Sequence, residues 1–518
     1  MRTGNSRVKN SIYNFITSIG AQLITIVMRF ISRSVFIHTL GESYLGIGGL
    51  FENILSMLSL AELGIGTAIL YRLYTPLAEK NVPRIQAWMH FYKNAYRVIA
   101  LVVGAIGLCL IPLLPILIND YQKFNSLGIS AVIIYCLFLF QSVSSYLFFS
   151  YRSAIVQADQ KQYLLTIVSY VIITTTSILQ ITSLVILRNY IVYLVIAVAM
   201  TILENIIYAI ISQKLYPYIG KKPQEKVSKK EIKETIKDCF SLFLYRVNSI
   251  VIKSTDTIIL SIAKGLETIA LYSNYLIFYS TINALISRVF GALVHSVGNL
   301  HTTKKVDHEY LIFKTTVFVA ILLGATAGVG IFVVADEFIN VWIGQQWIIP
   351  QPFSLLMGFE LFTVTVCAAL AKFRNALGLF QQAKYRPIFS AIVNVASSAV
   401  LVRYWGISGV ISGTIIAYWT TFLVFDPAIL YKYGFGGKYS LKNFYIMVLG
   451  NLAVVFLIGS VLKGLCSYAL VGMGWMSVVV HAVICAVATP LVLFVVNWKK
   501  DEAQYLLSLM KKILLRIK

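Results

Sequence analysis

The chain consists of long apolar segments separated by short polar ones. A helix needs about 20 mostly apolar residues to cross a lipid bilayer. Fourteen segments meet this requirement, and their lengths predict membrane-spanning helices rather than strands. The first six predicted spans cover residues 11–37, 43–71, 88–117, 126–150, 162–186 and 189–213. The other eight follow a long polar stretch and cover residues 238–262, 266–299, 312–335, 350–372, 384–403, 407–430, 442–462 and 473–497.

The composition is that of an integral membrane protein. The 518 residues are 58% hydrophobic and 13% charged, whereas soluble domains carry about 25% charged residues. The net charge of +23 does not indicate a nucleic-acid partner, because the basic residues lie between apolar segments rather than on one solvated surface. The six cysteines show no C-x-x-C spacing, so they predict neither a metal site nor a disulfide framework.

The distribution of lysine and arginine orients the predicted spans, because cytoplasmic loops of membrane proteins carry an excess of these residues. With a cytoplasmic amino terminus, most of the 44 cations fall in cytoplasmic segments. Fourteen spans then also place the carboxy terminus in the cytoplasm. The cations in the predicted outside loops are Lys123, Arg188, Lys264, Arg403 and Lys463.

The two halves of the chain are organised alike. Arg29 precedes Gly41 by twelve positions, and Lys253 precedes Gly265 by the same number. Twelve helical residues rise about 18 Å, which places both cations near the middle of the bilayer. Internal repeats with polar groups at their interface are typical of secondary transporters. We therefore predict a six-helix lobe over 1–213, a cytoplasmic linker over 214–237, a second six-helix lobe over 238–431, an additional helix pair over 432–498 and an amphipathic cytoplasmic tail helix over 499–518.

Some cations lie inside the predicted spans. A central Arg or Lys costs about 2.5–3.5 kcal/mol even on a lenient insertion scale, so several of them facing lipid would cancel a typical folding free energy of about 5–15 kcal/mol. They must therefore face water, pair with acids or reach an interface. Pairing with Asp256 is an alternative for Lys253, and a cytoplasmic interfacial position is one for Arg288. The cations concerned are Arg29, Arg33, Arg246, Lys253 and Arg288.

The acids expected at the same depth are fewer than these cations. The excess positive charge would not be tolerated in a dry core, so it predicts a hydrated cavity that binds an anion. A guanidinium group matches phosphate in shape and charge. A phosphorylated or carboxylated solute is therefore the predicted substrate class. The acids are Glu52, Glu204, Asp256 and Glu360.

Three stretches carry a family resemblance. They are "LGESYLGIGGLFENILSMLSLAELGIGTAILYRLYTPLAEKN" from Leu40, "TDTIIL" with "ALYSNY" after it, and "NALGLFQQAKYRPIFSAIVNVASSAVLVRYWGISGVISGTIIAY" from Asn375. In this order they resemble the polysaccharide transporters of the multidrug/oligosaccharidyl-lipid/polysaccharide exporter superfamily. Positions of the third stretch where members often have the same residue types are Gly378, Asn394, Gly406, Gly409, Gly413 and Thr414.

The resemblance implies a V-shaped pair of six-helix lobes around a central cationic cavity, with two further helices outside the core. Members flip undecaprenyl-diphosphate-linked oligosaccharides from the inner to the outer leaflet of the bacterial cytoplasmic membrane, by alternating access, for capsule or other surface polysaccharides. The implied partners are this lipid-linked substrate, membrane lipids and polysaccharide polymerase machinery. The implied coupling ion is H⁺ or Na⁺, and the candidate residues for it are Asp256, Glu52, Glu360, Asn394 and Thr414.

Two other function classes remain as alternatives. A cation-coupled drug exporter of the same superfamily usually has twelve spans and a less cationic cavity. A membrane polysaccharide polymerase needs catalytic groups held around the reacting bond. The longest predicted outside loop, from Asp336 to about Pro350, contains no paired-carboxylate, metal-ligand or nucleophile motif. We therefore predict a transporter that is not an enzyme and that holds no cofactor or metal.

Overall fold

The computed structural model describes residues 24–517 apart from 60–64, 120, 127, 222, 224, 299–305, 380 and 469–471. The side chains of residues 67–68, 237–253, 288–298, 376, 381 and 510–517 also lie outside the described part. Within the described residues the secondary structure is helical, without strands. The chain divides into two compact units, Met1–Ala270 and Leu271–Lys518. The fold class predicted from the apolar segments is therefore confirmed as all-α.

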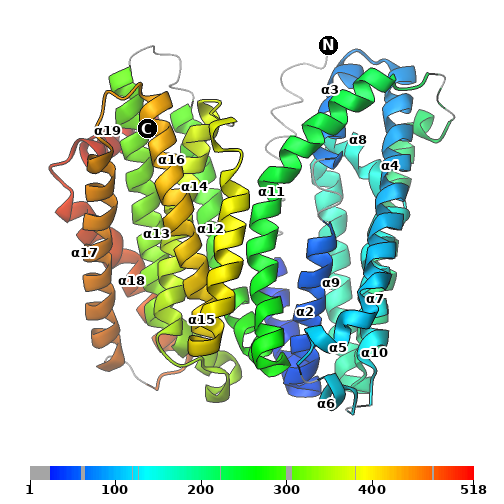
Figure 1. Ribbon diagram of the computed structural model, residues 1–518, viewed down its shortest axis with the longest axis horizontal. Coiled ribbons are helices and arrows are strands. Elements are labelled where there is room, and N and C mark those ends of the chain that lie inside the picture. Colours follow the sequence, from blue (N-terminus) through cyan, green and yellow to red (C-terminus); the bar gives the residue numbers. More distant parts are fainter. Residues whose placement is uncertain are drawn as a thin grey trace. The chain divides into compact units, whose positions relative to one another are not determined.

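Unit 1 is a bundle of long helices with short helices at its ends (Figure 1). α7, α9 and α10 pack side by side, and α11 packs against α2, α3 and α5. Its elements are a helix over 24–40, α2 (Glu42–Leu58), α3 (Ile65–Ala78), α4 (Val82–Cys109), α5 (Leu114–Leu117), α6 (Tyr121–Asn125), α7 (Ala131–Leu147), α8 (Ser153–Ala158), α9 (Gln162–Leu187), α10 (Tyr190–Leu215) and α11 (Lys229–Lys264).

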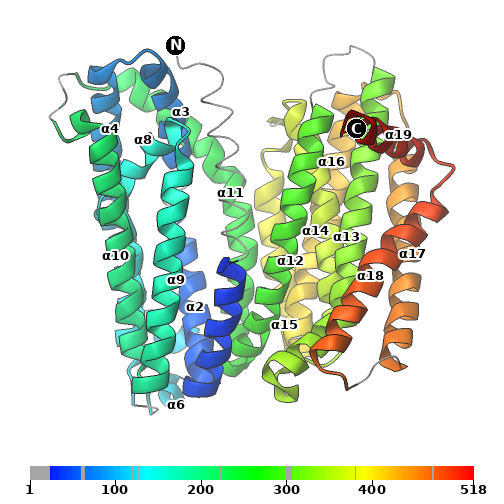
Figure 2. The same ribbon diagram turned by 180° about the vertical axis from the view of Figure 1, so that it is seen from behind.

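Unit 2 is built around α13, which packs against α14, α17 and α18 (Figure 2). One buried cluster runs along α13 through Phe313, Val317, Ile321 and Val329. The elements are α12 (Leu266–Gly298, whose first turn belongs to unit 1), α13 (Val306–Ile343), α14 (Phe353–Ala376), α15 (Arg386–Ala417), α16 (Leu423–Ile429), α17 (Leu441–Tyr468), α18 (Trp475–Val496) and α19 (Asp501–Ile517).

The helices establish a multi-pass membrane protein. In the described part of the chain, nine helices are long and apolar enough to cross a membrane, or ten if the bent pair Ala131–Leu147 and Ser150–Ala158 is one span. Several other predicted spans also coincide with helices, such as α2 and α11. The total of fourteen, the cytoplasmic termini and the predicted domain boundaries stay predictions.

Two glycines make the same turn at equivalent places in the two halves. Gly41 has φ 84° and ψ −173°, and Gly265 has φ 83° and ψ −179°. Residues with a Cβ rarely adopt this backbone conformation. Each glycine ends one long helix and starts the next, α2 after Gly41 and α12 after Gly265. The shared geometry agrees with the internal repeat that the spacing of Arg29 and Lys253 predicts.

The segment from Arg386 to Gly434 is long enough for two spans, and it folds back on itself. Gly406 has φ 55° and ψ −129° inside α15. Beyond it the chain runs antiparallel to the first part: Ser398 Oγ donates to the carbonyl of Val410 at 3.2 Å, and a Cβ at Gly413 would lie 2.6 Å from the Ser398 amide nitrogen. The two predicted spans 384–403 and 407–430 thus form a tight helical hairpin.

The hairpin gives a test of this packing. Gly413→Ala forces a methyl group into the Ser398 backbone, and overpacking of this kind costs about 1–3 kcal/mol. Gly450→Ala in α17 is the matched control, because a Cβ there meets open space. We expect Gly413→Ala alone to lower the melting temperature of the purified protein in detergent. Equal melting temperatures for the two variants would contradict the close contact.

Candidate functional site

The two predicted substrate-binding cations in the first half of the chain lie on one helix, close to an acidic residue of the following helix. Arg29 is exposed and Arg33 is half-buried on the helix over 24–40. The exposed Glu52 of α2 interacts electrostatically with Arg33 and, more weakly, with Arg29. The one carboxylate of Glu52 thus interacts with two guanidinium groups. An anion is the ligand that such a site favours.

Aromatic rings from α10 complete this cluster. Phe36, one turn beyond Arg33, makes edge-to-face contacts with Tyr190 and Tyr193 at centroid distances of 5.5 and 5.3 Å. Both tyrosine hydroxyls interact electrostatically with Arg33 and Glu52. The rings therefore pack Arg33 and Glu52 between the helix over 24–40 and α10. Sequence reasoning missed the two tyrosines, because a tyrosine in an apolar helix is most simply a core residue.

The cations of the second half fall outside the described side chains. Arg246 and Lys253 lie on α11 and Arg288 lies on α12, but their side-chain positions are not part of the description. Asp256, one turn after Lys253, is buried on α11. The predicted Lys253–Asp256 pair and the predicted roles of these three cations stay predictions, as do the V-shaped arrangement and the central cavity.

The remaining coupling-ion candidates lie in two places in unit 2. Glu360 on α14 accepts a hydrogen bond from the hydroxyl of Tyr279 on α12 at 3.4 Å. Asn394 and Thr414 are both buried and join the two arms of the hairpin, with Asn394 Nδ2 donating to Thr414 Oγ1 at 2.9 Å. This hydrogen bond gives both residues a part in the packing of the hairpin. A role for any of these residues in ion coupling stays a prediction.

A buried ion-pair triad was missed. Asp426 on α16 is fully buried and pairs with Arg374, at 2.5 Å, and with Arg386. The guanidinium of Arg386 also stacks on the ring of Phe422, 4.0 Å from its centroid. From the sequence both arginines count as cytoplasmic loop cations and Asp426 is not among the acids at depth. The structure corrects this, because α14, α15 and α16 enclose all three side chains.

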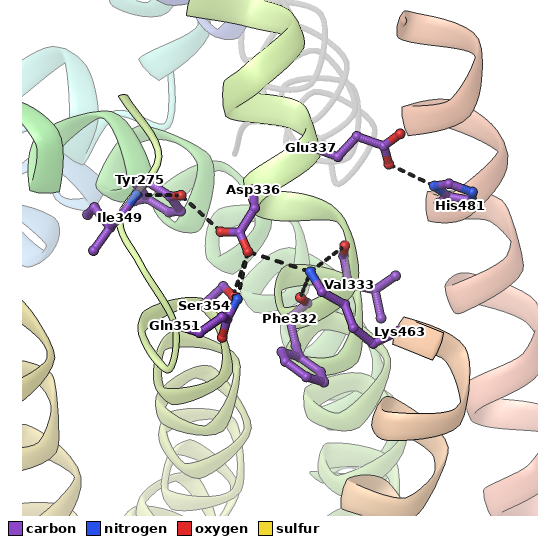
Figure 3. Close-up of polar contacts among 10 residues, drawn as sticks. All are labelled: Tyr275, Phe332, Val333, Asp336, Glu337, Ile349, Gln351, Ser354, Lys463 and His481. Atoms are coloured by element: carbon purple, nitrogen blue, oxygen red, sulfur yellow. Dashed lines mark hydrogen bonds and ion pairs between the residues drawn. The ribbon is translucent and has the colours of Figure 1, made fainter. Parts of the chain in front are cut away.

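A second polar cluster was also missed, near the outer end that the sequence predicts for α13 (Figure 3). Asp336 accepts hydrogen bonds from the hydroxyl of Tyr275 at 2.9 Å and from Gln351 Nε2 at 2.7 Å. Lys463 of α17 lies 3.5 Å from the same carboxylate and donates to the α13 carbonyl of Phe332. From the sequence Lys463 is a cation of the predicted outside loop between spans 442–462 and 473–497, and Asp336 begins another predicted outside loop, which runs to about Pro350. Ser354 of α14 also donates to Asp336, at 3.1 Å, so the cluster joins α12, α13, α14 and α17.

The next residue of α13 makes a separate pair. Glu337 Oε2 lies 2.7 Å from Nδ1 of His481 on α18. His481 is buried, with 2% of its side chain exposed, whereas 24% of the Glu337 side chain is exposed. Together with the Lys463–Asp336 pair, this contact fastens both additional helices, α17 and α18, to α13.

Comparison with known proteins defines the fold. No protein-family model and no curated protein sequence matches the chain. Solved structures of transport proteins match it over most of its length. The chain thus has the same fold as these transport proteins, as the resemblance in its sequence motifs implies.

Two of these structures are especially informative. One is the lipid II flippase MurJ in an inward closed conformation, with a TM-score of 0.65 and 14% identity over 94% of this chain and 99% of that chain. Another is a multidrug-resistance MATE family transporter in an inward-facing conformation, with a TM-score of 0.58 and 14% identity over 82% of this chain and 99% of that chain. Both are transport proteins, as predicted for this chain; that it is not an enzyme stays a prediction.

The buried triad predicts a large stability effect. Asp426→Ala leaves Arg374 and Arg386 without their shared carboxylate, and breaking a buried ion pair from one side costs about 3–5 kcal/mol. We expect a marked loss of thermal stability or of folded protein in the membrane.

Asp307→Ala is the matched control for this prediction. Asp307 is exposed and pairs with Lys438 at 2.5 Å. Its carboxylate also accepts a hydrogen bond from Tyr439 and raises the pKa of that hydroxyl to about 12. Exposed ion pairs contribute little to stability, so this variant should melt like the wild type. If Asp426→Ala melts at the same temperature as Asp307→Ala, the buried triad does not stabilise the fold.

Proposed function

We propose that the protein is a flippase that moves undecaprenyl-diphosphate-linked oligosaccharide units from the inner to the outer leaflet of the bacterial cytoplasmic membrane. The translocated units would serve capsule or other cell-surface polysaccharides. Alternating access between two lobes would expose the substrate site to each leaflet in turn. The polymerase machinery that extends the polysaccharide would be a downstream partner.

The observation that carries the proposal is the cluster of Arg29, Arg33 and Glu52. A diphosphate carries the negative charge that two guanidinium groups and a single carboxylate leave unbalanced. The planar guanidinium can donate two parallel hydrogen bonds to phosphate oxygens, which an ammonium group cannot. Exposure of Arg29 and Glu52 leaves room for a ligand beside them. The lipid tail would stay in the bilayer while the headgroup crosses.

The fold likeness supports a lipid-linked substrate over a free one. The lipid II flippase structure matches 94% of this chain with a TM-score of 0.65, against 82% and 0.58 for the MATE family transporter. The name of the first protein describes transport of a lipid-linked substrate. The likeness, at 14% identity, is one of fold. The proposed substrate is inferred from the cluster of Arg29, Arg33 and Glu52.

A cation-coupled drug exporter is the second candidate, and the likeness to the MATE family transporter favours it. The two functions differ in the charge of the substrate. A drug exporter for organic cations would be hindered by the excess positive charge around Arg29 and Arg33. Drug resistance conferred by expression of this chain, without any effect on surface polysaccharide, would favour the second candidate.

Removing the cations tests the substrate site. Arg29→Ala and Arg33→Ala each remove a charge-assisted hydrogen-bond donor worth about 1.5–3 kcal/mol, so export should fall about 10- to 100-fold while the amount of protein in the membrane is retained. Arg246→Ala should lower export to a similar extent if the cations of the second half of the chain also bind the substrate. Arg403→Ala, at an exposed position near the hairpin turn, is the control and should leave export unchanged. Unchanged export by all the variants would refute the assignment.

The substrate class can be read directly in cells. When the protein is depleted, lipid-linked oligosaccharides should accumulate on the inner leaflet and be detected by mass spectrometry of the lipid extract. The mass of the accumulated species would also identify the sugar unit. A depleted strain with normal levels of every undecaprenyl-diphosphate-linked intermediate would exclude the proposed function.

A further inference from the structure

The first half of α4 carries a row of polar side chains along one face. His90, Asn94 and Arg97 follow one another at intervals of four and three positions, so they share one side of the helix. Each of them is exposed, and Lys93 beside Asn94 is half-buried. These four residues, the α4 basic row, contain no acid and cover about 10 Å of helix length.

The opposite face of α4 fixes the direction in which the basic row points. Trp88, Tyr92, Tyr96 and Val103 also follow helical spacing, and each is at most 5% exposed. They pack in a hydrophobic core of unit 1, where the hydroxyl of Tyr92 donates to that of Tyr96 at 2.8 Å. Both views show α4 along one edge of unit 1 (Figures 1 and 2). Because the core holds one face of the helix, the basic row lies on the outer face.

The basic row has no acidic partner in the part of the chain that the structure describes. Within that part, no ion pair or hydrogen bond includes the side chain of His90, Lys93 or Arg97. By contrast, Arg84 in the first turn of the same helix pairs with Glu231 of α11. The charge of Arg84 thus serves to hold two helices together, whereas the charges of the basic row are available to a ligand.

Apolar side chains continue the same face of α4 beyond the basic row. Leu101 and Leu108, four and eleven positions after Arg97, are 71% and 58% exposed. From Val98 to Leu108 the helix rises about 15 Å, which is half of the ~30 Å hydrocarbon core of a bilayer. A phospholipid combines a phosphate group for the cations with acyl chains for this apolar stretch. The sequence predicts that α4 begins in the cytoplasm, so the matching lipid belongs to the inner leaflet.

We propose that the α4 basic row is a binding site for the headgroup of an anionic phospholipid of the inner leaflet. Arg97, which lies nearest the apolar stretch, holds the phosphate, and Lys93 adds a second positive charge beside it. A zwitterionic phospholipid has the same chains, but its ammonium group is repelled by these cations. The proposal goes beyond the proposed function and does not depend on it, because the row shares no residue with the cluster of Arg29, Arg33 and Glu52.

Native mass spectrometry of the full chain in an uncharged detergent measures the selectivity of the site. With equal amounts of phosphatidylglycerol and phosphatidylcholine added, the wild type should retain phosphatidylglycerol in about fivefold excess or more. The double variant Lys93→Gln/Arg97→Gln should lose this excess and still melt like the wild type, because both side chains lie outside the core. Arg188→Gln is the matched control, since it removes an exposed cation that has no second cation within one helical turn.

Three results of this measurement would overturn the proposal. The first is equal retention of the two lipids by the wild type. The second is an unchanged excess of phosphatidylglycerol in the double variant. The third is release of the bound phosphatidylglycerol by inorganic phosphate, which would assign the basic row to a soluble phosphate compound.

Photo-crosslinking in cell membranes tests the location of the site. Benzoylphenylalanine in place of Leu101 would react with the lipid held by the basic row. In place of Val171 on α9, which is 60% exposed and has no Lys or Arg within seven positions, it would sample the bulk lipid. Anionic phospholipid should be enriched about fivefold at position 101 over position 171, and Lys93→Gln/Arg97→Gln should abolish the enrichment. Equal lipid compositions at the two positions, or enrichment of an undecaprenyl-diphosphate lipid instead, would overturn the proposal.

Discussion

The arrangement of this protein depends on one constraint: a charged side chain within apolar helices must have a partner or water. Each described case meets it differently. Asp426 is enclosed and takes two arginines, and Asp336 takes a lysine and several neutral donors. Arg29, Arg33 and Glu52 instead remain at least partly accessible, with two guanidinium groups around one carboxylate. Enclosed charges hold helices together, whereas accessible ones are available to a ligand.

This division assigns different tasks to the two units. In unit 2 the ion pairs lie at helix junctions, and their loss should disturb the packing of α13 with its neighbours. In unit 1 Arg29 is exposed, so under the proposed function it is available to bind the substrate. The proposed function requires both kinds of group, because stable bundles would have to carry a polar headgroup through the apolar core of the bilayer. The fold shared with transport proteins accords with this use of charge.

Much of the fold could be predicted from the sequence, because span length and apolar composition are local properties. The helices, the glycine turns at Gly41 and Gly265, and the hairpin at Gly406 all follow from such local signals. Partners brought together by tertiary packing could not be predicted in the same way. Arg374 and Arg386 lie near a loop in the sequence and are therefore read as solvated, yet their carboxylate is 52 and 40 positions further along the chain. His481 and Glu337 are separated by 144 positions.

The central claim is that the deep cations of the first half face water and bind an anionic headgroup. The most direct measurement places a cysteine at position 29 or 33 in a variant without the six native cysteines, and reacts it with a charged, membrane-impermeant thiol reagent. The account predicts rapid labelling, which an added undecaprenyl-diphosphate-linked oligosaccharide slows. Labelling by membrane-soluble reagents alone, or labelling that the lipid-linked sugar leaves unchanged, would contradict it.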